Sequence, residues 1–176
     1  MRSASWTAAS KNDMLSSLVL NDLLVRLVRL AGRWALRAAS FRVLVEGDSM
    51  TPTLADGDRL LVSRFAYGLE APARGDIILL RDPSRPGSEC IKRILALPGE
   101  TVRLDGLIPS IQAPGGTDAS GADISWTLGG RQYFVAGDNL ARSTDSRSYG
   151  PVDRSAIIGR AWYRYASPRQ RTGLLP

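Results

Sequence analysis

The spacing of hydrophobic and polar residues changes character close to residue 40. Residues 18–39 repeat apolar side chains at steps of three and four, and arginines recur there at positions 26, 29, 33 and 37. This period predicts an amphipathic helix with one basic and one apolar face. Arginine interrupts the segment too often for a transmembrane helix, which needs about 20 mainly apolar residues. The pattern is typical of a helix that lies in a membrane interface; packing against its own domain and a misassigned start codon are the alternatives.

Downstream of residue 40 the helical period gives way to short apolar runs separated by Gly, Pro and Asp. The runs span residues 41–45, 59–62, 77–80, 91–97, 101–104, 133–136 and 157–165. Short runs punctuated by turn residues are typical of strands. The pattern therefore predicts a mostly β domain, either a sandwich or a partly open barrel.

The same pattern gives the expected domain organisation. Residues 1–40 form a basic amphipathic segment, and residues 41–168 form the domain. Within the domain, residues 105–130 are rich in Gly, Ser, Pro, Asp and Ala, which predicts a surface loop or insertion. A flexible tail is expected over residues 169–176, since chain ends are poorly ordered unless something holds them.

The amino-acid composition excludes most classes of catalytic site and metal site. The 176 residues include no histidine and one cysteine, Cys90. Serine–histidine triads, cysteine–histidine dyads, histidine metal sites and internal disulfides are therefore excluded, and we expect no cofactor and no metal. Of the 23 basic residues, only Lys11 and Lys92 are lysines. Arginine stays charged and cannot act as a base, so Lys92 is the one basic side chain of the predicted domain that is able to take up a proton.

The net charge of +6 is concentrated at the N-terminus. Residues 1–40 carry six basic and two acidic residues, a net of +4, which leaves +2 for residues 41–176. A nucleic-acid-binding domain would carry a basic stripe of its own. We therefore expect a membrane surface as a partner, contacted through residues 18–39, and no nucleic acid.

Two side chains form a candidate catalytic pair. Ser49 lies in residues 47–54, where Gly and Pro predict a sharp turn that exposes the hydroxyl; we call this segment the nucleophile turn. Serine is a weak nucleophile and needs a base within hydrogen-bond reach. Strand alternation places Lys92 on one face with Cys90 and Ile94. Burial on that face would disfavour the charged ammonium of Lys92, and a neutral amine is able to accept a proton. The hypothesis is therefore that Lys92 acts as the base for Ser49.

A serine in a turn or a lysine in a strand usually has only a structural role when it occurs alone. A third segment with polar side chains strengthens the hypothesis of a catalytic pair. The segment runs from residue 137 to 150, is polar, and follows the predicted strand at 133–136. Asp145 and Arg147 are spaced to form an ion pair, and the Ser143 hydroxyl is able to orient an amine.

In order and approximate spacing, these segments resemble the type I signal peptidase family, which are serine proteases with a Ser-Lys dyad. The matching stretches lie within about residues 41–166 and are 47–54 with 57–58, 65–68, 74–77, 91–93, 97–100, 137–139 and 143–150. The resemblance implies that Ser49 is the nucleophile, with its N–H donating to the oxyanion, and that Lys92 is the general base. It also implies that Ser143 hydrogen-bonds the lysine amine and that Asp145 and Arg147 hold the site together.

The resemblance further implies a mostly β fold around a shallow apolar groove that accepts small side chains. The residues expected to form the nucleophile turn or to line that groove are Gly47, Asp48, Met50 and Pro52. The expected partners are signal or leader peptides of preproteins, and the expected location is the cell membrane, with its side left open. Gly47 stands where some members carry a serine that donates to the oxyanion, so the second donor is unassigned. Cys90 stands where an aromatic residue is common.

Three other interpretations stay open. Short family members that trim the leader of nickel superoxide dismutase are similar, which would make this chain a maturation protease for one substrate. Self-cleaving repressors share a Ser-Lys pair and a similar turn, but they need a helix-turn-helix, and about 40 residues with one predicted helix precede this domain. The third is an inactive β module that binds leaders or lipid, against which intact Ser49 and Lys92 argue.

Overall fold

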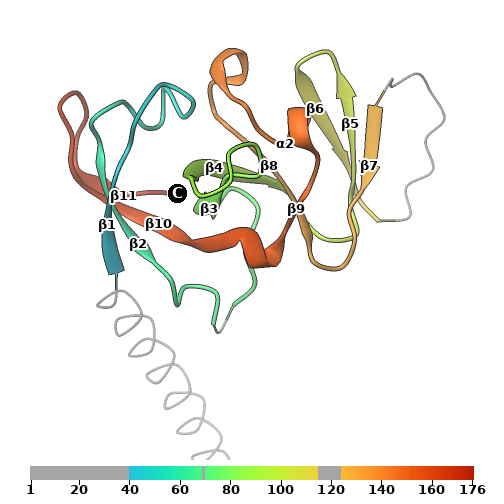
Figure 1. Cartoon of the computed structure of the whole chain (residues 1–176), viewed down its shortest axis with the longest axis horizontal. Helices are drawn as coiled ribbons and strands as arrows, with labels where there is room; N and C mark the ends of the chain where they lie inside the picture. Colours follow the sequence, from blue (N-terminus) through green and yellow to red (C-terminus); the bar gives the residue numbers. More distant parts are fainter. Residues whose placement is uncertain (1–39, 69, 115–123) are drawn as a thin grey trace, which may run out of the picture. The chain divides into compact units, whose positions relative to one another are not determined.

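The computed structural model describes residues 40–68, 70–114 and 124–176 (Figure 1). The amphipathic helix predicted over residues 18–39, and with it nearly all of the N-terminal segment 1–40, lies outside these residues. Among the described residues, no helix is long and apolar enough to cross a membrane. The mostly β prediction is confirmed, since strands make up most of the regular structure and the described helices are three or four residues long.

A large antiparallel sheet forms the body of the domain. Its order is β1 (Ser40–Leu44), β2 (Arg59–Ser63), β10 (Ile157–Ala166), β3 (Ile77–Arg81), β4 (Glu89–Ala96), β8 (Gln132–Ala136) and β9 (Val152–Asp153), with β11 (Gly173–Leu174) paired to β10 off this path. The register of β10 against β2 shifts between Ala161 and Tyr163, and again between Arg164 and Ala166. Such bulges bend a strand and increase its twist. The sheet accordingly curls into an open half-barrel (Figure 1), the partly open form of the two architectures expected.

The core explains the unbroken apolar run of β3. Its four consecutive apolar side chains are each at most 2% exposed. Ile77 and Leu79 join one hydrophobic cluster with Met50, whereas Ile78 and Leu80 join another. A strand that is buried on both faces shows no polar alternation. Because Met50 belongs to the first cluster, the nucleophile turn is anchored directly in the core.

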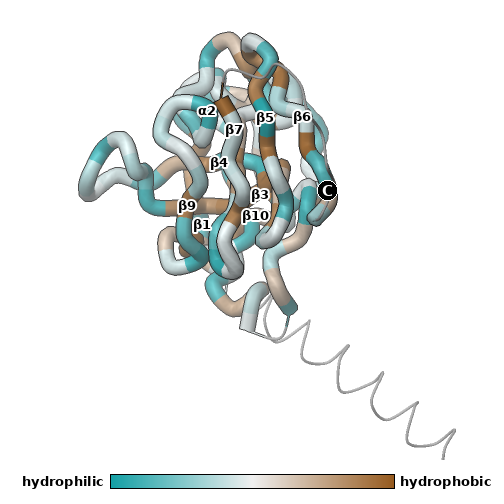
Figure 2. Tube along the Cα trace, turned by 90° about the vertical axis from the view of Figure 1, so that its right-hand side faces the viewer, coloured by the Kyte–Doolittle hydropathy of each residue, from teal (hydrophilic) through white to brown (hydrophobic). Residues whose placement is uncertain are grey.

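A second sheet has three strands, in the order β6 (Ile108–Gln112), β5 (Thr101–Asp105) and β7 (Ile124–Thr127). The segment 105–130, predicted as a surface loop or insertion, therefore contains two strands, β6 and β7, that the sequence pattern did not indicate. Hydrophobic and hydrophilic positions alternate along β5 (Figure 2), and Trp126 of β7 packs on Phe134 of the large sheet with ring centroids 5.3 Å apart. Ile108 and Ile124 stay 67% and 49% exposed. The two outer strands are held by backbone pairing with β5 and not by burial of their side chains. Their residues therefore need not be apolar, and their composition is typical of a loop.

The chain end is also more ordered than the sequence predicts. The flexible tail expected over residues 169–176 contains β11, whose Gly173 and Leu174 pair with Arg164 and Tyr163 of β10. The chain reverses direction after Ser167, whose hydroxyl accepts hydrogen bonds from the next backbone N–H groups of the turn. A local turn thus returns the chain to the sheet, so that two residues of the predicted tail are paired with β10.

Two short helices connect the strands around the third polar segment. A 3₁₀ turn, η1 (Leu140–Arg142), precedes α2 (Ser146–Tyr149), and a second 3₁₀ turn, η2 (Arg154–Ala156), leads into β10. The Asp145 side chain caps α2 by accepting from the Arg147 N–H at 3.2 Å. This cap fixes the position of Asp145 between β8 and α2.

Candidate active site

The nucleophile turn is fixed on both sides of Ser49. Met50 and Leu54 are 1% and 0% exposed and hold its apolar side in the core. Gly47 has a φ of +84°, a left-handed conformation that favours glycine, and its N–H donates to Asp56 Oδ1 at 2.8 Å. Among the described residues, no backbone carbonyl accepts the Ser49 N–H. The N–H beside the Ser49 hydroxyl is therefore not tied to the backbone of the described residues.

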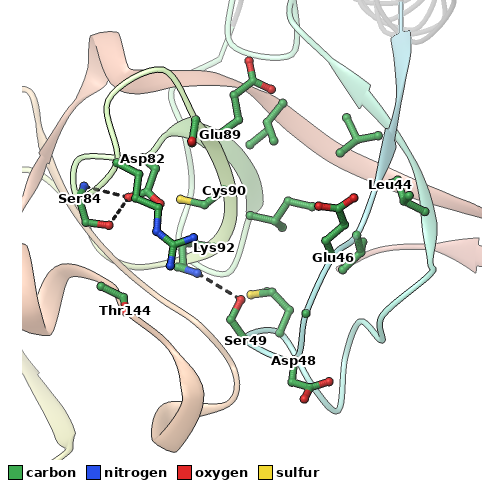
Figure 3. A pocket seen from close by; sticks show the side chains of 18 of the residues that line it. Leu44, Glu46, Asp48, Ser49, Asp82, Ser84, Glu89, Cys90, Lys92 and Thr144 are labelled. Atoms are coloured by element: carbon green, nitrogen blue, oxygen red, sulfur yellow. Dashed lines mark hydrogen bonds between the residues drawn. The ribbon is translucent and has the colours of Figure 1, made fainter.

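Lys92 reaches Ser49 from the middle of β4. Its backbone is paired with Ile78 of the neighbouring strand β3, and the residue is 4% exposed. The amine Nζ lies 3.2 Å from Ser49 Oγ (Figure 3). No carboxylate of the described residues forms an ion pair with this amine. The structure therefore buries Lys92 as the strand alternation predicted and brings its amine within reach of the serine proton.

Asp145 and Arg147 form the ion pair that their spacing predicted. Arg147 Nε and Nη2 donate to the two carboxylate oxygens of Asp145, each at 2.8 Å, and the carboxylate is completely buried. It also accepts the Gly137 N–H at 3.0 Å. Burial alone would raise the pKa of Asp145, but the hydrogen bonds from Arg147 and Gly137 outweigh it and hold that pKa below its usual value. The ionised Asp145 carboxylate, which accepts hydrogen bonds from both Arg147 and Gly137, thus fixes the chain at the end of β8.

Ser143 is placed next to this assembly without a hydrogen bond of its own. Its hydroxyl is buried and, within the described part of the chain, has no partner of acceptable geometry, although it contributes to lowering the pKa of Asp145. Gly137 makes the close packing possible. A Cβ added there would stand 2.6 Å from Ser143 Cβ and closer still to the Ser49 carbonyl oxygen. The sequence singled out Ser143 and Gly137, but not the contact between them.

Two further links hold the third segment, one to strand β4 and one to the nucleophile turn, and sequence reasoning assigned neither. Arg93, the neighbour of Lys92, binds Asp138 through Nη2–Oδ2 at 2.7 Å and Nε–Oδ1 at 2.8 Å. Burial raises the pKa of Asp138, but the hydrogen bonds from Arg93 outweigh that effect and lower it. The Asn139 N–H donates to the Ser49 carbonyl at 3.0 Å. The sequence signals that could have pointed to these residues are the position of Arg93 next to Lys92 and the position of Asp138 next to Asn139 in a polar turn. The pairing of β4 with β8 brings Arg93 and Asp138 into contact.

A cavity of about 550 Å³ opens over the Ser49–Lys92 pair. Its walls come from the end of β1, the nucleophile turn, the start of β4, the β3–β4 turn and the loop after η1 (Figure 3). Of the residues predicted for the turn or groove, Gly47, Asp48 and Met50 line it, whereas Pro52 lies in the turn and not in the lining. At its rim, Asp48 Oδ2 and Arg142 Nη1 form an exposed ion pair at 2.9 Å. The cavity is therefore partly apolar, with charged groups around it.

Comparison with known proteins places this geometry in a family. A family model described as signal peptidase, peptidase S26, matches residues 20–112 and 110–166. The chain belongs to the signal peptidase family. This confirms the resemblance drawn from the sequence and makes the protein a serine endopeptidase of the signal peptidase type.

Three curated relatives illustrate the range of this family. A probable signal peptidase I-1 of Synechocystis is 32% identical over 159 residues, covering 74% of this chain and 73% of the relative. Signal peptidase I V of Bacillus subtilis is 35% identical and covers 65% of this chain and 79% of the relative. Subunit 1 of the mitochondrial inner membrane protease of Mus musculus is 33% identical, over 69% of this chain and 67% of the relative. The family thus includes proteins of bacteria and of mitochondria.

The reactivity of Cys90, which lines the cavity of this signal peptidase family member, tests how far the cavity wall shields its side chains from solvent. Burial raises the pKa of the thiol to about 11, although the nearby Lys92 opposes the shift. A thiol below its pKa is neutral and a poor nucleophile. At pH 8 we expect iodoacetamide to modify native Cys90 at least about tenfold more slowly than the same chain unfolded in urea, with the native rate rising as the pH approaches 11. Mass spectrometry measures both rates; equal rates at pH 8 would contradict the half-buried position of the thiol and its raised pKa.

Proposed function

We propose that this chain removes signal or leader peptides from preproteins with Ser49 as nucleophile and Lys92 as general base. The observation that supports these roles best is the 3.2 Å contact between Lys92 Nζ and Ser49 Oγ. A base must lie within about 2.6–3.2 Å of the proton's donor atom. Lys92 is 4% exposed, and no carboxylate of the described residues forms an ion pair with it.

The first half of the proposed reaction forms an ester. The neutral Lys92 amine takes the hydroxyl proton of Ser49 as Oγ attacks the scissile carbonyl carbon. The negative charge that develops on the carbonyl oxygen is stabilised by the Ser49 N–H, which is not bonded to a described backbone carbonyl. The C–N bond then breaks, and the lysine ammonium donates its proton to the departing amine. The leader peptide remains attached to Ser49 through its carboxyl end.

The second half regenerates the serine. Lys92, neutral again, takes a proton from a water molecule that attacks the ester carbonyl. The C–O bond to Ser49 breaks, and the ammonium returns its proton to Oγ. No step in this cycle needs histidine, which the chain lacks.

The remaining predicted residues receive supporting roles in this proposal. Asp145, held by Arg147, fixes the Gly137 N–H at 3.0 Å and with it the strand end that packs against the nucleophile turn. We assign to the Ser143 hydroxyl, which is buried without a hydrogen-bond partner among the described residues, the task of holding the Lys92 amine while Ser49 is engaged with substrate.

The substrate assignment combines the groove with the names of the relatives. Two of the three relatives described above are signal peptidases, and the third is a protease of the mitochondrial inner membrane. The apolar part of the cavity is lined by Val43, Leu79, Cys90 and Ile91, which suits small apolar side chains before the cut. We propose that the enzyme works at the cell membrane, with residues 18–39 as its contact with the membrane surface.

The decisive experiment incubates the full chain with a panel of preproteins in liposomes and measures product masses. We expect release of intact leader peptides by the wild-type chain and none by Ser49→Ala. Cleavage of a single preprotein in the panel would favour the maturation-protease alternative. Cleavage by Ser49→Ala, or no cleavage of any leader by the wild type, would contradict the proposed function.

A further inference from the structure

The C-terminal segment lies against the back of the nucleophile turn. Gln170 Nε2 donates to the Pro52 carbonyl at 2.7 Å, and Arg164 Nη1 donates to the Thr53 carbonyl at 2.9 Å. These carbonyls belong to the third and fourth residues after Ser49. In Figure 1 the red loop after β10 stands beside the teal loop that carries this turn. The turn is therefore braced, at residues that do not line the cavity, by side chains more than 110 positions away in the chain.

A buried carboxylate ties this bracing together. Asp58 is completely buried, and its Oδ2 accepts from the Ala55 N–H at 3.0 Å and from Arg164 Nη1 at 3.2 Å. Its Oδ1 accepts from the Ser167 hydroxyl. The Asp58 carboxylate thus joins the end of the nucleophile turn, strand β10 and the C-terminal loop.

The loop itself is closed around Arg164. The guanidinium donates through Nε and Nη2 to the Arg171 carbonyl at 3.0 and 2.8 Å, and through Nη1 to Gln170 Oε1. The Gln170 N–H donates in turn to the Ser167 hydroxyl at 2.8 Å. The Arg164 side chain is only 14% exposed. Because both ends of the Gln170 amide are engaged, the direction of its Nε2 donor towards Pro52 is determined.

We propose that the C-terminal segment 164–171 is a positioning element for catalysis, in which Gln170 and Arg164 hold the nucleophile turn so that Ser49 faces Lys92. This inference rests on the proposed function. Lys92 is fixed by its place within a central strand, whereas Ser49 is carried by a turn whose position depends on side-chain support. A displacement of about 1 Å in a reacting group costs on the order of 10²-fold in rate, so bracing of the turn acts on the chemical step.

Gln170→Glu tests this role without removing the side chain. Glutamate keeps the size of glutamine and the oxygen that faces Arg164, but it places a second oxygen where Nε2 donates to the Pro52 carbonyl. We expect kcat to fall about tenfold and KM to change less than twofold. We expect the melting temperature to stay the same or to rise, because the new carboxylate can pair with Arg164. The assay uses the full chain in detergent and a fluorogenic leader peptide with alanine at the first and third positions before the cut.

Arg169→Ala is the matched control, because it changes a neighbouring exposed residue whose side chain donates no hydrogen bond to the nucleophile turn. It should match the wild type in kcat and melting temperature. A Gln170→Glu enzyme with kcat within twofold of the wild type would overturn the inference and leave the proposed function intact. So would a loss of kcat that merely follows a loss of melting temperature. A wild-type chain that fails to cleave while folded would overturn the proposed function and this inference with it.

Discussion

Replacing Lys92 by arginine is expected to lower kcat for leader-peptide cleavage by at least about 10³-fold. General acid–base catalysis contributes roughly 10²–10⁴-fold, and arginine keeps its proton at every pH the protein tolerates. The 3.2 Å contact with Ser49 Oγ would then join the hydroxyl to a permanent donor, which cannot take the serine proton. Steady-state cleavage of a leader peptide, with product masses, measures the loss.

Lys92→Met separates this chemical effect from the cost of burying a fixed charge. Methionine fills a similar volume without charge, so the protein should stay folded, as judged by its melting temperature, and should be equally inactive. Lys11→Arg, which changes the only other lysine in the sequence, should cleave at the wild-type rate. If either Lys92 variant kept more than a tenth of wild-type kcat while Ser49→Ala had none, the lysine-base mechanism would be wrong.

Adding one methyl group at Gly137 is the second change with a large expected effect. In Gly137→Ala the new Cβ would stand 2.6 Å from Ser143 Cβ and closer still to the backbone oxygen of Ser49. Backbone on one side and a buried side chain on the other leave no direction in which the strain relaxes freely. We expect a loss of stability of about 1–3 kcal/mol from overpacking. We also expect kcat to fall on the order of 10²-fold, because the nucleophile is displaced.

Gly130→Ala is the appropriate control, since a Cβ at Gly130 meets nothing within 4 Å. Both variants are compared by thermal unfolding followed with tryptophan fluorescence and by kcat at a temperature where both are fully folded. The control should match the wild type in both measurements. A Gly137→Ala enzyme with kcat within twofold of the wild type would show that the turn and the third segment are not packed as tightly as described.

The accuracy of the sequence-based predictions follows the range of the interactions involved. Strand alternation predicted the burial of Lys92, and the spacing of Asp145 and Arg147 predicted an ion pair, because both depend on residues close together in the chain. The three-stranded sheet was missed, because the outer isoleucines Ile108 and Ile124 stay exposed and their strands depend on pairing with β5. Strand β11 was missed for a related reason, because its two residues form a strand only by pairing with β10.

The surroundings of the Ser49–Lys92 contact show the same limit. The segments of the site were identified in order, and the family comparison confirmed what they resemble. The Arg93–Asp138 ion pair was not assigned, although both residues lie in those segments. Its two partners are 45 positions apart, and only the antiparallel pairing of β4 with β8 brings them together.

Amino-acid composition limits which chemistry is available to this chain. With no histidine and a single lysine in the domain, Ser49 has one basic side chain that is able to serve as its base. The fold brings Ser49 and Lys92, which are 43 positions apart in the chain, to within a hydrogen bond of each other. It also packs Gly137 closely against Ser143 and the Ser49 carbonyl, and it brings the Gln170 amide to the Pro52 carbonyl of the nucleophile turn. Composition is a property of the chain, whereas such distances depend on strand register and on the packing of segments that are remote in sequence.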